Sequence, residues 1–143
     1  MKYLFLSLLI TTSLTVQAKP KNYGSAVVSE VRSIYDGDTF RATIEGWPPI
    51  IGEAVGIRVN GVDTPEMRTK CDQEKLLARK AKKHAVAVLR EGKLITLENM
   101  HRGKYFRIVA DVYVDGKSLA ESLIDANLGV PYYGKTKTKD WCK

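Results

Sequence analysis

Hydrophobic and polar residues alternate with a period of two in the first half of the chain, which is typical of β-strands. The segments Ala26–Ile34 and Thr39–Ile44 are rich in Val, Ile and Thr. Between them, Asp36-Gly37-Asp38 predicts a tight hairpin turn, because glycine accepts positive φ and aspartate tolerates it. Gly52–Val62 predicts a third strand, which runs directly into Asp63 and further charged residues.

After Glu66 the apolar positions recur with the period of an α-helix. Asp72 is a suitable N-cap and Gly92 a suitable stop, so we expect a helix between them. Its apolar stripe consists of Leu77, Ala81, Ala85, Val88 and Leu89. The basic residues of this segment fall mostly off the stripe, which is typical of a solvated helix face.

The last third of the chain predicts two further strands and a short helix. Lys93–Glu98 and Tyr105–Val114 have strand character. Ser118 and Glu121 have the spacing of a capping box, which predicts a helix that ends at about Asn127.

The order of these elements, β-β-β-α-β-β-α, favours a closed sheet, since five short strands joined by tight turns must avoid free edges. A length of 143 residues suits one compact domain with a real core. We therefore predict an α+β, mainly β fold: a five-stranded oligonucleotide-binding (OB-fold) barrel with two to three packed helices.

Residues 1–18 have the pattern of a signal peptide. Lys2 supplies a positive start, a mostly apolar run follows, and Val16-Gln17-Ala18 suits a signal peptidase. The apolar run is shorter than the ~20 residues that a membrane-spanning helix needs. We expect export to a periplasm or the cell exterior, and a mature domain of residues 19–143 with its core at about 26–133.

The chain is basic, with 23 Lys and Arg against 16 Asp and Glu and a net charge of +7. Cleavage would remove Lys2 and one of these charges. Such a surplus favours acidic partners, nucleic acid or an anionic membrane, through long-range attraction and counterion release. The sequence lacks a basic amphipathic helix with large apolar residues, which disfavours a membrane-surface protein.

The chain has two cysteines, Cys71 and Cys142, whose spacing matches no metal motif. In an oxidising compartment they are expected to form a disulfide. The bridge would close a loop of about 70 residues and tie down the C-terminal tail, with a stabilisation of roughly 2–4 kcal/mol. Two free thiols are the alternative.

Charge is concentrated in the segment Arg58–Glu66, which contains two carboxylates, and in the turn that carries Asp36 and Asp38. A basic protein that approaches polyanions gains nothing from clustered carboxylates unless a cation offsets their repulsion of phosphate. The candidate ligands are oxygen donors, which favours Ca²⁺ or Mg²⁺ over zinc or copper. Arginines can then hold the phosphate oxygens in bidentate fashion.

Four motifs together resemble the staphylococcal nuclease (thermonuclease) family, in the same order and with similar spacing, from about Val27 to Tyr133. They are Asp36-Gly37-Asp38-Thr39, Arg58 followed by Val62-Asp63-Thr64-Pro65-Glu66, Lys104-Tyr105-Phe106-Arg107, and Asp115-Gly116-Lys117. The Asp-Gly-Asp-Thr and Val-Asp-Thr-Pro-Glu motifs are specific in combination. The chain is similar to an exported bacterial member of that family.

The resemblance implies an oligonucleotide-binding barrel and a calcium-dependent nuclease. Such an enzyme hydrolyses phosphodiester bonds of DNA and RNA with low sequence specificity and leaves 3′-phosphates. The implied ligands of one Ca²⁺ ion are Asp38, Asp63 and the backbone carbonyl of Thr64, with Asp36 acting through water.

The resemblance also implies roles at the substrate. Arg58 and Arg107 would hold the scissile phosphate, and Glu66 would be the general base. The implied substrate-binding residues are Lys104, Tyr105, Tyr132 and Tyr133. The last two are adjacent, whereas the family's tyrosines are separated by one residue, so we expect only one of them to stack on a base. Phe106 replaces a glycine of the family, and we expect it to alter the approach to Arg107.

Three alternatives stay open. Glu66 can be a structural partner that bonds to the backbone of the adjacent loop and orders water. The whole chain can be a catalytically inactive nucleic-acid-binding OB-fold module, or a basic protein for surface interactions. The sequence implies no stable protein partner and no membrane contact after cleavage, and a monomer is the default.

Overall fold

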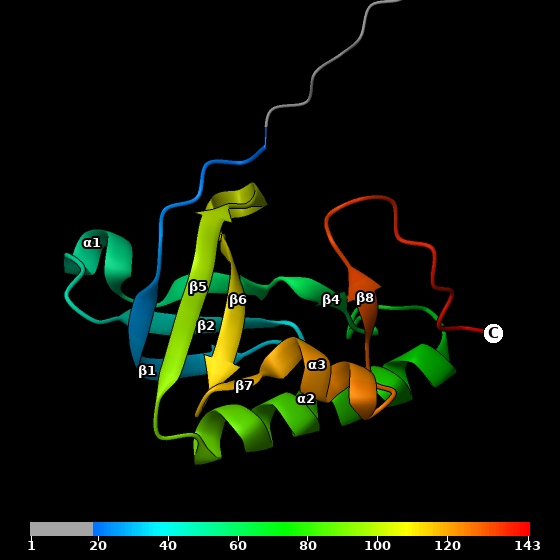
Figure 1. Cartoon of the computed structure of the whole chain (residues 1–143). Helices are drawn as coiled ribbons and strands as arrows, with labels where there is room; N and C mark the ends of the chain where they lie inside the picture. Colours follow the sequence, from blue (N-terminus) through cyan, green and yellow to red (C-terminus); the bar gives the residue numbers. More distant parts are fainter. Residues whose placement is uncertain (1–18) are drawn as a thin grey trace, which may run out of the picture.

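The computed structural model describes residues 19–143, so the predicted signal peptide lies outside the described residues. The strands are β1 (Ala26–Ile34), β2 (Thr39–Ile44), β3 (Val55–Val59), β4 (Gly61–Asp63), β5 (Ile95–Arg102), β6 (Ile108–Val114), β7 (Lys117–Ser118) and β8 (Val130–Tyr132). The helices are α1 (Pro49–Gly52), α2 (Asp72–Glu91) and α3 (Leu119–Asp125), with a 3₁₀ turn η1 (Lys104–Phe106). Figure 1 shows their arrangement.

Five of the strands close into a barrel. Antiparallel pairs run in the order β3-β2-β1-β5-β6, and a parallel pairing of β3 with β6 joins the two ends. Closure removes the free edges that an open five-stranded sheet would expose. The predicted oligonucleotide-binding barrel is therefore confirmed, and β7 extends the sheet by a short pairing with β6.

Irregularities in β1 and β5 bend the sheet enough to close it. In β1 the register shifts twice, between Val28 and Glu30 and between Val31 and Ser33. In β5 it shifts between Glu98 and His101. An extra residue in one strand increases the local twist and bend, and a small barrel needs this curvature.

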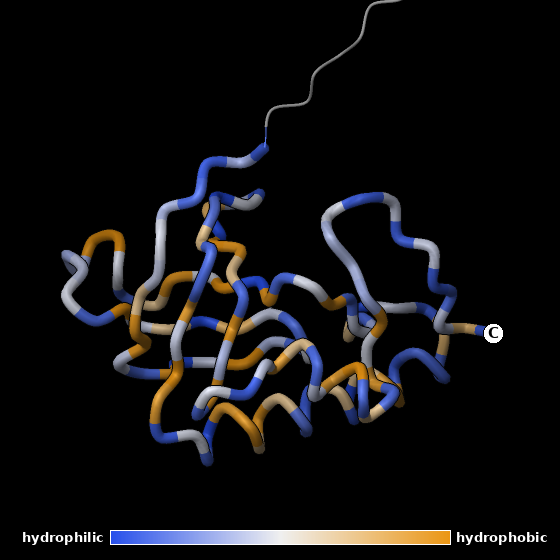
Figure 2. The backbone as a smooth tube through the Cα atoms, viewed as in Figure 1, coloured by the Kyte–Doolittle hydropathy of each residue, from blue (hydrophilic) through white to orange (hydrophobic). Residues whose placement is uncertain are grey.

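Helices α2 and α3 cover one end of the barrel and contribute to a single core (Figure 1). The stripe predicted for α2 is confirmed, since Ala81, Ala85 and Leu89 are buried. Leu119 and Leu123 of α3 join the same cluster. Figure 2 shows hydrophobic segments alternating with hydrophilic ones along these elements. Among residues 19–143, no helix has the length and hydrophobicity needed to cross a bilayer.

Two predicted strands differ from the observed ones. The segment Gly52–Val62 is split, because the chain turns at Asn60 and Gly61, where Gly61 has a φ of 82°. Asn60 fixes this bend with a side-chain hydrogen bond of 2.7 Å to Asp111 Oδ1. The strand expected from Tyr105 begins at Ile108 instead, since Lys104–Phe106 form the turn η1. The elements α1, β7 and β8 were not predicted from the pattern.

The start of α2 is capped by a different residue from the one predicted. The N-cap is Cys71 rather than Asp72, and its sulfur accepts a hydrogen bond of 3.3 Å from the Glu74 N–H. Gly92 does end the helix, but in an extended conformation. A side chain there would overlap Val114, so close packing rather than a left-handed φ favours glycine. The Ser118 cap of α3 is confirmed, with a bond of 3.2 Å from the Glu121 N–H.

The predicted disulfide is present and joins the C-terminal tail to the start of α2. The Cα atoms of Cys71 and Cys142 are 5.9 Å apart, within the usual range for a bridge. Trp141, the residue before Cys142, is buried with 9% exposure. The tail is therefore fixed at its end by a covalent bond and a packed indole, and it runs close to the start of α2 (Figure 1).

We expect that replacing both Cys71 and Cys142 with Ser lowers the free energy of unfolding by about 2–4 kcal/mol, because the bridge constrains the unfolded chain. Urea denaturation of the two proteins measures the difference. The unreduced parent should show no reactive thiol in a thiol assay. Two reactive thiols would disprove the bridge.

Candidate functional site

A cleft of about 520 Å³ lies at the barrel surface beside the β1–β2 turn, η1 and the chain after β8. It gathers most of the residues singled out from the sequence. Those that line it are Asp36, Asp38, Arg58, Thr64, Glu66, Lys104, Arg107, Tyr132 and Tyr133. Asp63 is buried beside the cleft and pairs with Arg58, while Tyr105, the neighbour of Lys104, is 87% exposed and is not among the residues that line the cleft. Segments far apart in the sequence thus form one surface.

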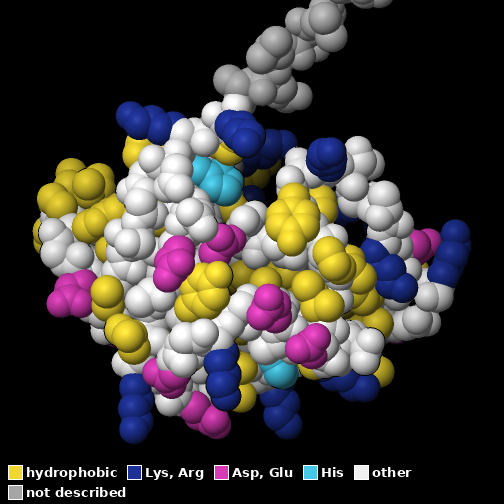
Figure 3. Space-filling view, in the orientation of Figure 1, with side chains coloured by type: hydrophobic (Ala, Val, Ile, Leu, Met, Phe, Trp, Pro, Cys, Tyr) yellow, Lys and Arg dark blue, Asp and Glu magenta, His cyan; other side chains and the backbone are white. Residues whose placement is uncertain are grey.

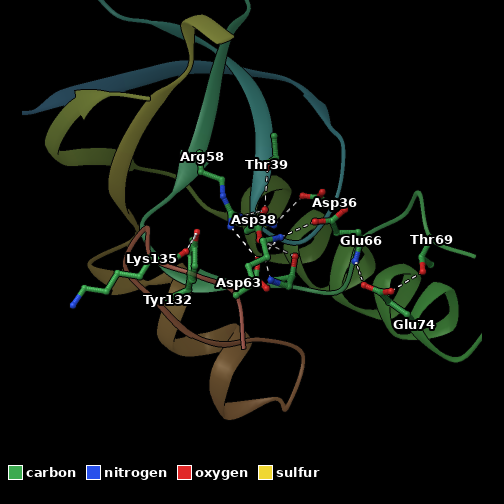
Figure 4. A network of polar contacts seen from close by, with 12 residues as sticks. Asp36, Asp38, Thr39, Arg58, Asp63, Glu66, Thr69, Glu74, Tyr132 and Lys135 are labelled. Atoms are coloured by element: carbon green, nitrogen blue, oxygen red, sulfur yellow. Dashed lines mark hydrogen bonds and ion pairs between the residues drawn. The ribbon is translucent and has the colours of Figure 1, made fainter. Parts of the chain in front are cut away.

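The Asp36-Gly37-Asp38 turn presents two buried carboxylates. Asp36 Oδ1 accepts the Asp38 N–H at 3.2 Å, which holds the turn from within. Asp38 Oδ2 accepts both the N–H of Thr64 at 2.9 Å and its hydroxyl at 3.0 Å. Asp38 therefore ties the first hairpin to the segment after β4 (Figure 4).

Gly37 permits this close approach. A Cβ at this position would lie 2.8 Å from Thr64 Cγ2 and 2.9 Å from Ala81 Cβ on α2. These distances are shorter than normal packing contacts. A side chain at residue 37 would therefore push apart the turn, the Thr64 segment and the helix.

Arg58 lies between the carboxylates. It is on β3 opposite Thr39 of β2, which places its side chain next to the turn. The guanidinium forms ion pairs with Asp38 and, at 3.3 Å through Nη2, with Asp63 Oδ1. The side chain is only 14% exposed. Arg58 therefore balances the charge of two nearly buried aspartates.

Asp63 and Thr64 are positioned by the pairing of β4 with β8. Asp63 is opposite Val130, and Gly61 is opposite Tyr132. Asp63 and Thr64 are 3% and 2% exposed. The sequence after α3 therefore helps to fix a residue that lies more than sixty positions earlier in the chain.

Glu66 is held at its backbone and at its carboxylate by different residues. Its N–H donates to Glu74 Oε1 at 3.0 Å, and Glu74 Oε2 accepts the Thr69 hydroxyl at 2.6 Å. Its carboxylate accepts a hydrogen bond of 2.6 Å from Lys137 Nζ. The structural alternative predicted bonds from this carboxylate to the adjacent loop backbone, and the observed partner is instead a lysine of the tail.

Arg107 follows η1 and crosses the face of β3 at Gly56. A Cβ on Gly56 would lie 3.0 Å from Arg107 Cγ, so the glycine makes room for the arginine stem. The Arg107 Nε is buried and has no hydrogen-bond partner among residues 19–143. An unsatisfied buried donor is costly unless a ligand or water completes it. Arg107 is therefore placed to donate a hydrogen bond to an anion that binds in the cleft.

The turn η1 carries two residues with unusual backbone conformations. Tyr105 and Phe106 have φ values of 56° and 62°, in the left-handed region that residues other than glycine rarely adopt. The Phe106 ring lies 4.8 Å below the guanidinium carbon of Arg102, while Arg107 lies 5.8 Å from the Tyr105 ring centroid. Phe106 is 80% exposed and its ring contacts Arg102, and its effect on the approach to Arg107 stays a prediction.

The two adjacent tyrosines both line the cleft. The Tyr132 hydroxyl donates to the Lys135 carbonyl at 2.7 Å, which fixes its ring. Tyr133 is 74% exposed, with a ring carbon 3.7 Å from the position of a Cβ on Gly61. Tyr133 therefore offers the freer face for stacking, and base contact by one tyrosine stays a prediction.

Burial and neighbouring charges shift the pKa values of the central groups. Burial raises the pKa of Asp36, and the nearby Arg58 opposes this rise. Burial lowers the pKa of Arg58, which Asp63 and Asp36 oppose and Arg107 reinforces. Burial also lowers the pKa of Lys137, but its bonds to Glu66 and Asp63 outweigh that, and the net shift is upward. These side chains are therefore close enough for the charge of one to change the pKa of another.

The donor set fits a hard divalent cation. Asp36, Asp38 and Asp63 supply carboxylate oxygens that are at most 9% exposed, and the adjoining Thr64 adds a backbone carbonyl. Oxygen donors of this kind suit Ca²⁺ or Mg²⁺. Burying several carboxylates is costly unless cations are near. His101 also lines the cleft, which the sequence did not indicate, and its Nδ1 lies 3.3 Å from the Asn99 carbonyl oxygen.

Lys137 is the main residue of the site that sequence reasoning missed. It is one of several lysines in the polar tail, and nothing in its local pattern separates it from Lys135 or Lys139. The predicted disulfide was the feature of the sequence that could have placed Lys137 near Glu66. Cys71 lies five residues after Glu66 and Lys137 five residues before Cys142, so a bridge brings the two segments together.

Comparisons with known proteins agree with the motifs. The family described as Staphylococcal nuclease homologue matches residues 56–141. The chain is also 34% identical over 108 residues to the SPbeta prophage-derived endonuclease YokF of Bacillus subtilis (strain 168). The matched segment covers 73% of this chain and 34% of that relative. The chain therefore spans about a third of the relative's length.

We expect Gly37→Ala to lower the free energy of unfolding by about 1–3 kcal/mol, because overpacking forces the turn away from Thr64 and α2. Thermal or urea denaturation measures the loss. The matched test is Gly37→Ala with Thr64→Ser, which removes the crowded methyl group and keeps the hydroxyl that bonds to Asp38. The double variant should recover part of the loss. Gly37→Ala as stable as the parent would contradict the close packing.

Proposed function

Because this chain belongs to the staphylococcal nuclease family, we propose that it is a calcium-dependent nuclease. It would hydrolyse phosphodiester bonds of DNA and RNA with low sequence specificity and leave 3′-phosphates. The observation that carries this proposal is the convergence of buried aspartates with Arg58 and Arg107 in one cleft. Carboxylates that can bind a cation and guanidinium groups that can bind a phosphate therefore meet at one cleft.

The arginines hold the phosphate in this proposal. Arg107 brings a buried Nε that is unsatisfied within residues 19–143, and Arg58 is near enough that Arg107 lowers its pKa. Two guanidinium groups can grip non-bridging oxygens and stabilise the charge that develops in a five-coordinate transition state. Binding phosphate would also neutralise part of the repulsion between the two arginines.

The aspartates hold one Ca²⁺ ion in this proposal. Asp38, Asp63 and the Thr64 carbonyl are the ligands, and Asp36 acts through water. When bound, the ion supplies Lewis-acid polarisation of the phosphate and a template for water. The protein's part is to fix the ligands, and the bonds from Thr64 to Asp38 do so.

Glu66 is proposed as the general base. Its carboxylate lines the cleft and is 56% exposed, so water can reach it. In the reaction a water oxygen bonds to phosphorus while the P–O5′ bond breaks, and the water proton passes to Glu66. Solvent then protonates the O5′ leaving group. The Glu66 carboxylate is already engaged by Lys137, so we assign most of the acceleration to the arginines and the ion.

Substrate recognition would rely on backbone contacts and stacking. Lys104 lines the cleft and the adjacent Tyr105 is exposed, so we propose that they contact the phosphate and the sugar or base of the substrate. Tyr133 offers an exposed ring, and stacking on an aromatic ring is tolerant of sequence. The space-filling view shows basic side chains along the upper edge and the C-terminal side, and others among acidic side chains along the lower edge (Figure 3). A basic surface suits a polyanion.

An inactive nucleic-acid-binding module is the second candidate. It would need the same basic surface but not the carboxylates. The presence of Asp38 and both arginines in one cleft, with Asp63 buried beside it and paired to Arg58, favours catalysis. We further propose export to a periplasm or the cell exterior, which the disulfide supports, since such bridges persist in oxidising compartments.

A digestion assay with chelator controls tests the function. The protein from residue 19 on should degrade single-stranded DNA and RNA with Ca²⁺ present and should stop when a chelator is added, because the ion is part of the site. Binding of DNA without cleavage would favour the inactive module. Cleavage that a chelator leaves unchanged would disprove the metal assignment.

We expect Arg58→Lys to reduce the cleavage rate by about 10²- to 10³-fold, because a point charge cannot replace the bidentate fork. Single-turnover cleavage of a short DNA strand measures the effect. Arg79→Lys, an exposed position on α2, is the matched control and should keep the parental rate. Full activity of Arg58→Lys would show that Arg58 does not contact the reacting phosphate.

A further inference from the structure

The ammonium group of Lys137 lies against two carboxylates of the cleft. Its Nζ is 2.9 Å from Asp63 Oδ1 and 2.6 Å from Glu66 Oε1. Asp63 Oδ1 is the same oxygen that pairs with Arg58. A lysine from the C-terminal tail thus contacts a proposed metal ligand and the proposed general base at once.

The surrounding tail is held in place by several contacts. The Tyr132 hydroxyl bonds to the Lys135 carbonyl at one end of the segment. At the other end the Cys71–Cys142 disulfide and the buried Trp141 fix the chain. Lys137 lies between these anchors, so its position is set by the fold of the tail as well as by attraction to the carboxylates. We call residues 134–143 the strap.

The other lysines of the strap have different surroundings. The Lys135 side chain points away from Asp63 in Figure 4. Lys139 Nζ lies 5.3 Å from the centre of the Trp141 ring, and Lys143 pairs with Asp140. Among the described residues of the strap, Lys137 is the lysine paired with carboxylates of the cleft.

A positive charge at this place has a physical consequence for ion binding. A divalent cation that binds Asp63 competes with Lys137 for the same oxygen and is repelled by its charge at short range. The Asp63 side chain is 4% exposed, so solvent screens the competition less than at the surface. Lys137 itself is 44% exposed, which gives it room to turn away.

We propose that Lys137 is a tethered competitor of the divalent ion, held on Asp63 and Glu66 by the disulfide-anchored strap, and that it lowers the affinity of the cleft for Ca²⁺. This inference rests on the proposed function only in taking Asp63 as a metal ligand. A phosphate of the substrate offers Lys137 another partner. Substrate binding would then release Asp63 and favour loading of the ion, so that ion and nucleic acid bind cooperatively.

Calcium binding by the protein without nucleic acid tests the proposal. Isothermal titration calorimetry with CaCl₂, checked by Tb³⁺ luminescence, compares the parent with Lys137→Met. The variant should bind Ca²⁺ about tenfold more tightly, because a nearby like charge has been removed. Lys137→Arg keeps the charge and should retain the parental affinity.

Lys135→Met removes the same charge from the same segment and should change the affinity by less than about twofold, because solvent screens an exposed, more distant charge. Equal effects of Lys135→Met and Lys137→Met would overturn the proposal, since they would indicate general electrostatics. Unchanged or weaker binding by Lys137→Met would also overturn it, because Lys137 would then support the ligand.

The strap itself is tested by Cys142→Ser, with circular dichroism to verify that the barrel remains folded. Release of the strap should raise Ca²⁺ affinity toward that of Lys137→Met, and the double variant should show no further increase. Additive effects would overturn the role of the tether. If neither the parent nor Lys137→Met binds Ca²⁺, the calcium assignment of the proposed function fails and the competitor role fails with it. Binding with equal affinity overturns the competitor role alone.

Discussion

The site depends on the burial of the Asp38 carboxylate between two segments of chain. Asp38 is 4% exposed, accepts two hydrogen bonds from Thr64 and forms an ion pair with Arg58. A buried carboxylate is tolerated only when such partners compensate its lost hydration. These requirements explain the surrounding structure: a glycine at residue 37 for close approach, an arginine on the neighbouring strand, and Thr64 placed after a strand that pairs with β8.

The same arrangement supplies the proposed chemistry. The Asp38 and Asp63 carboxylates are nearly buried and fixed by the surrounding chain, so a cation that displaces their ion-pair partners finds the oxygens in place, and nearby guanidinium groups attract the phosphate. The cost is the burial of charged groups, which raises the pKa of Asp36 and lowers that of Arg58. Cations from two separate elements pair with the acids, namely Arg58 on β3 and Lys137 in the strap, while Arg107 after η1 lies in the same cleft. The barrel therefore serves as a rigid frame that brings opposite charges from distant segments to one cleft.

Much of this structure could be predicted from the sequence because it depends on local patterns. The Ser118 cap and the apolar stripe of α2 follow from capping preference and periodicity. The Asp-Gly-Asp turn lies where the pattern predicts it, but Gly37 does not adopt the positive φ that the prediction assumed, and close packing against Thr64 and Ala81 favours glycine there instead. The residues missed depend on tertiary contacts. Gly56 is explained only by the Arg107 stem that crosses it, and the helix cap is Cys71, whose sulfur is also bonded to Cys142 at the far end of the chain. Lys137 reaches Asp63 through a long-range link that its neighbours in sequence do not reveal.

A crystal structure of the protein in saturating CaCl₂ tests the central claim most directly, namely that Asp38 and Asp63 form the cation site of a nuclease cleft. We expect one ion with its oxygen ligands at about 2.3–2.6 Å, bound by both aspartates and the Thr64 carbonyl, with Lys137 withdrawn from Asp63. A structure at saturating Ca²⁺ with no ion on these aspartates, and with Arg58 and Lys137 still paired to them, would contradict it.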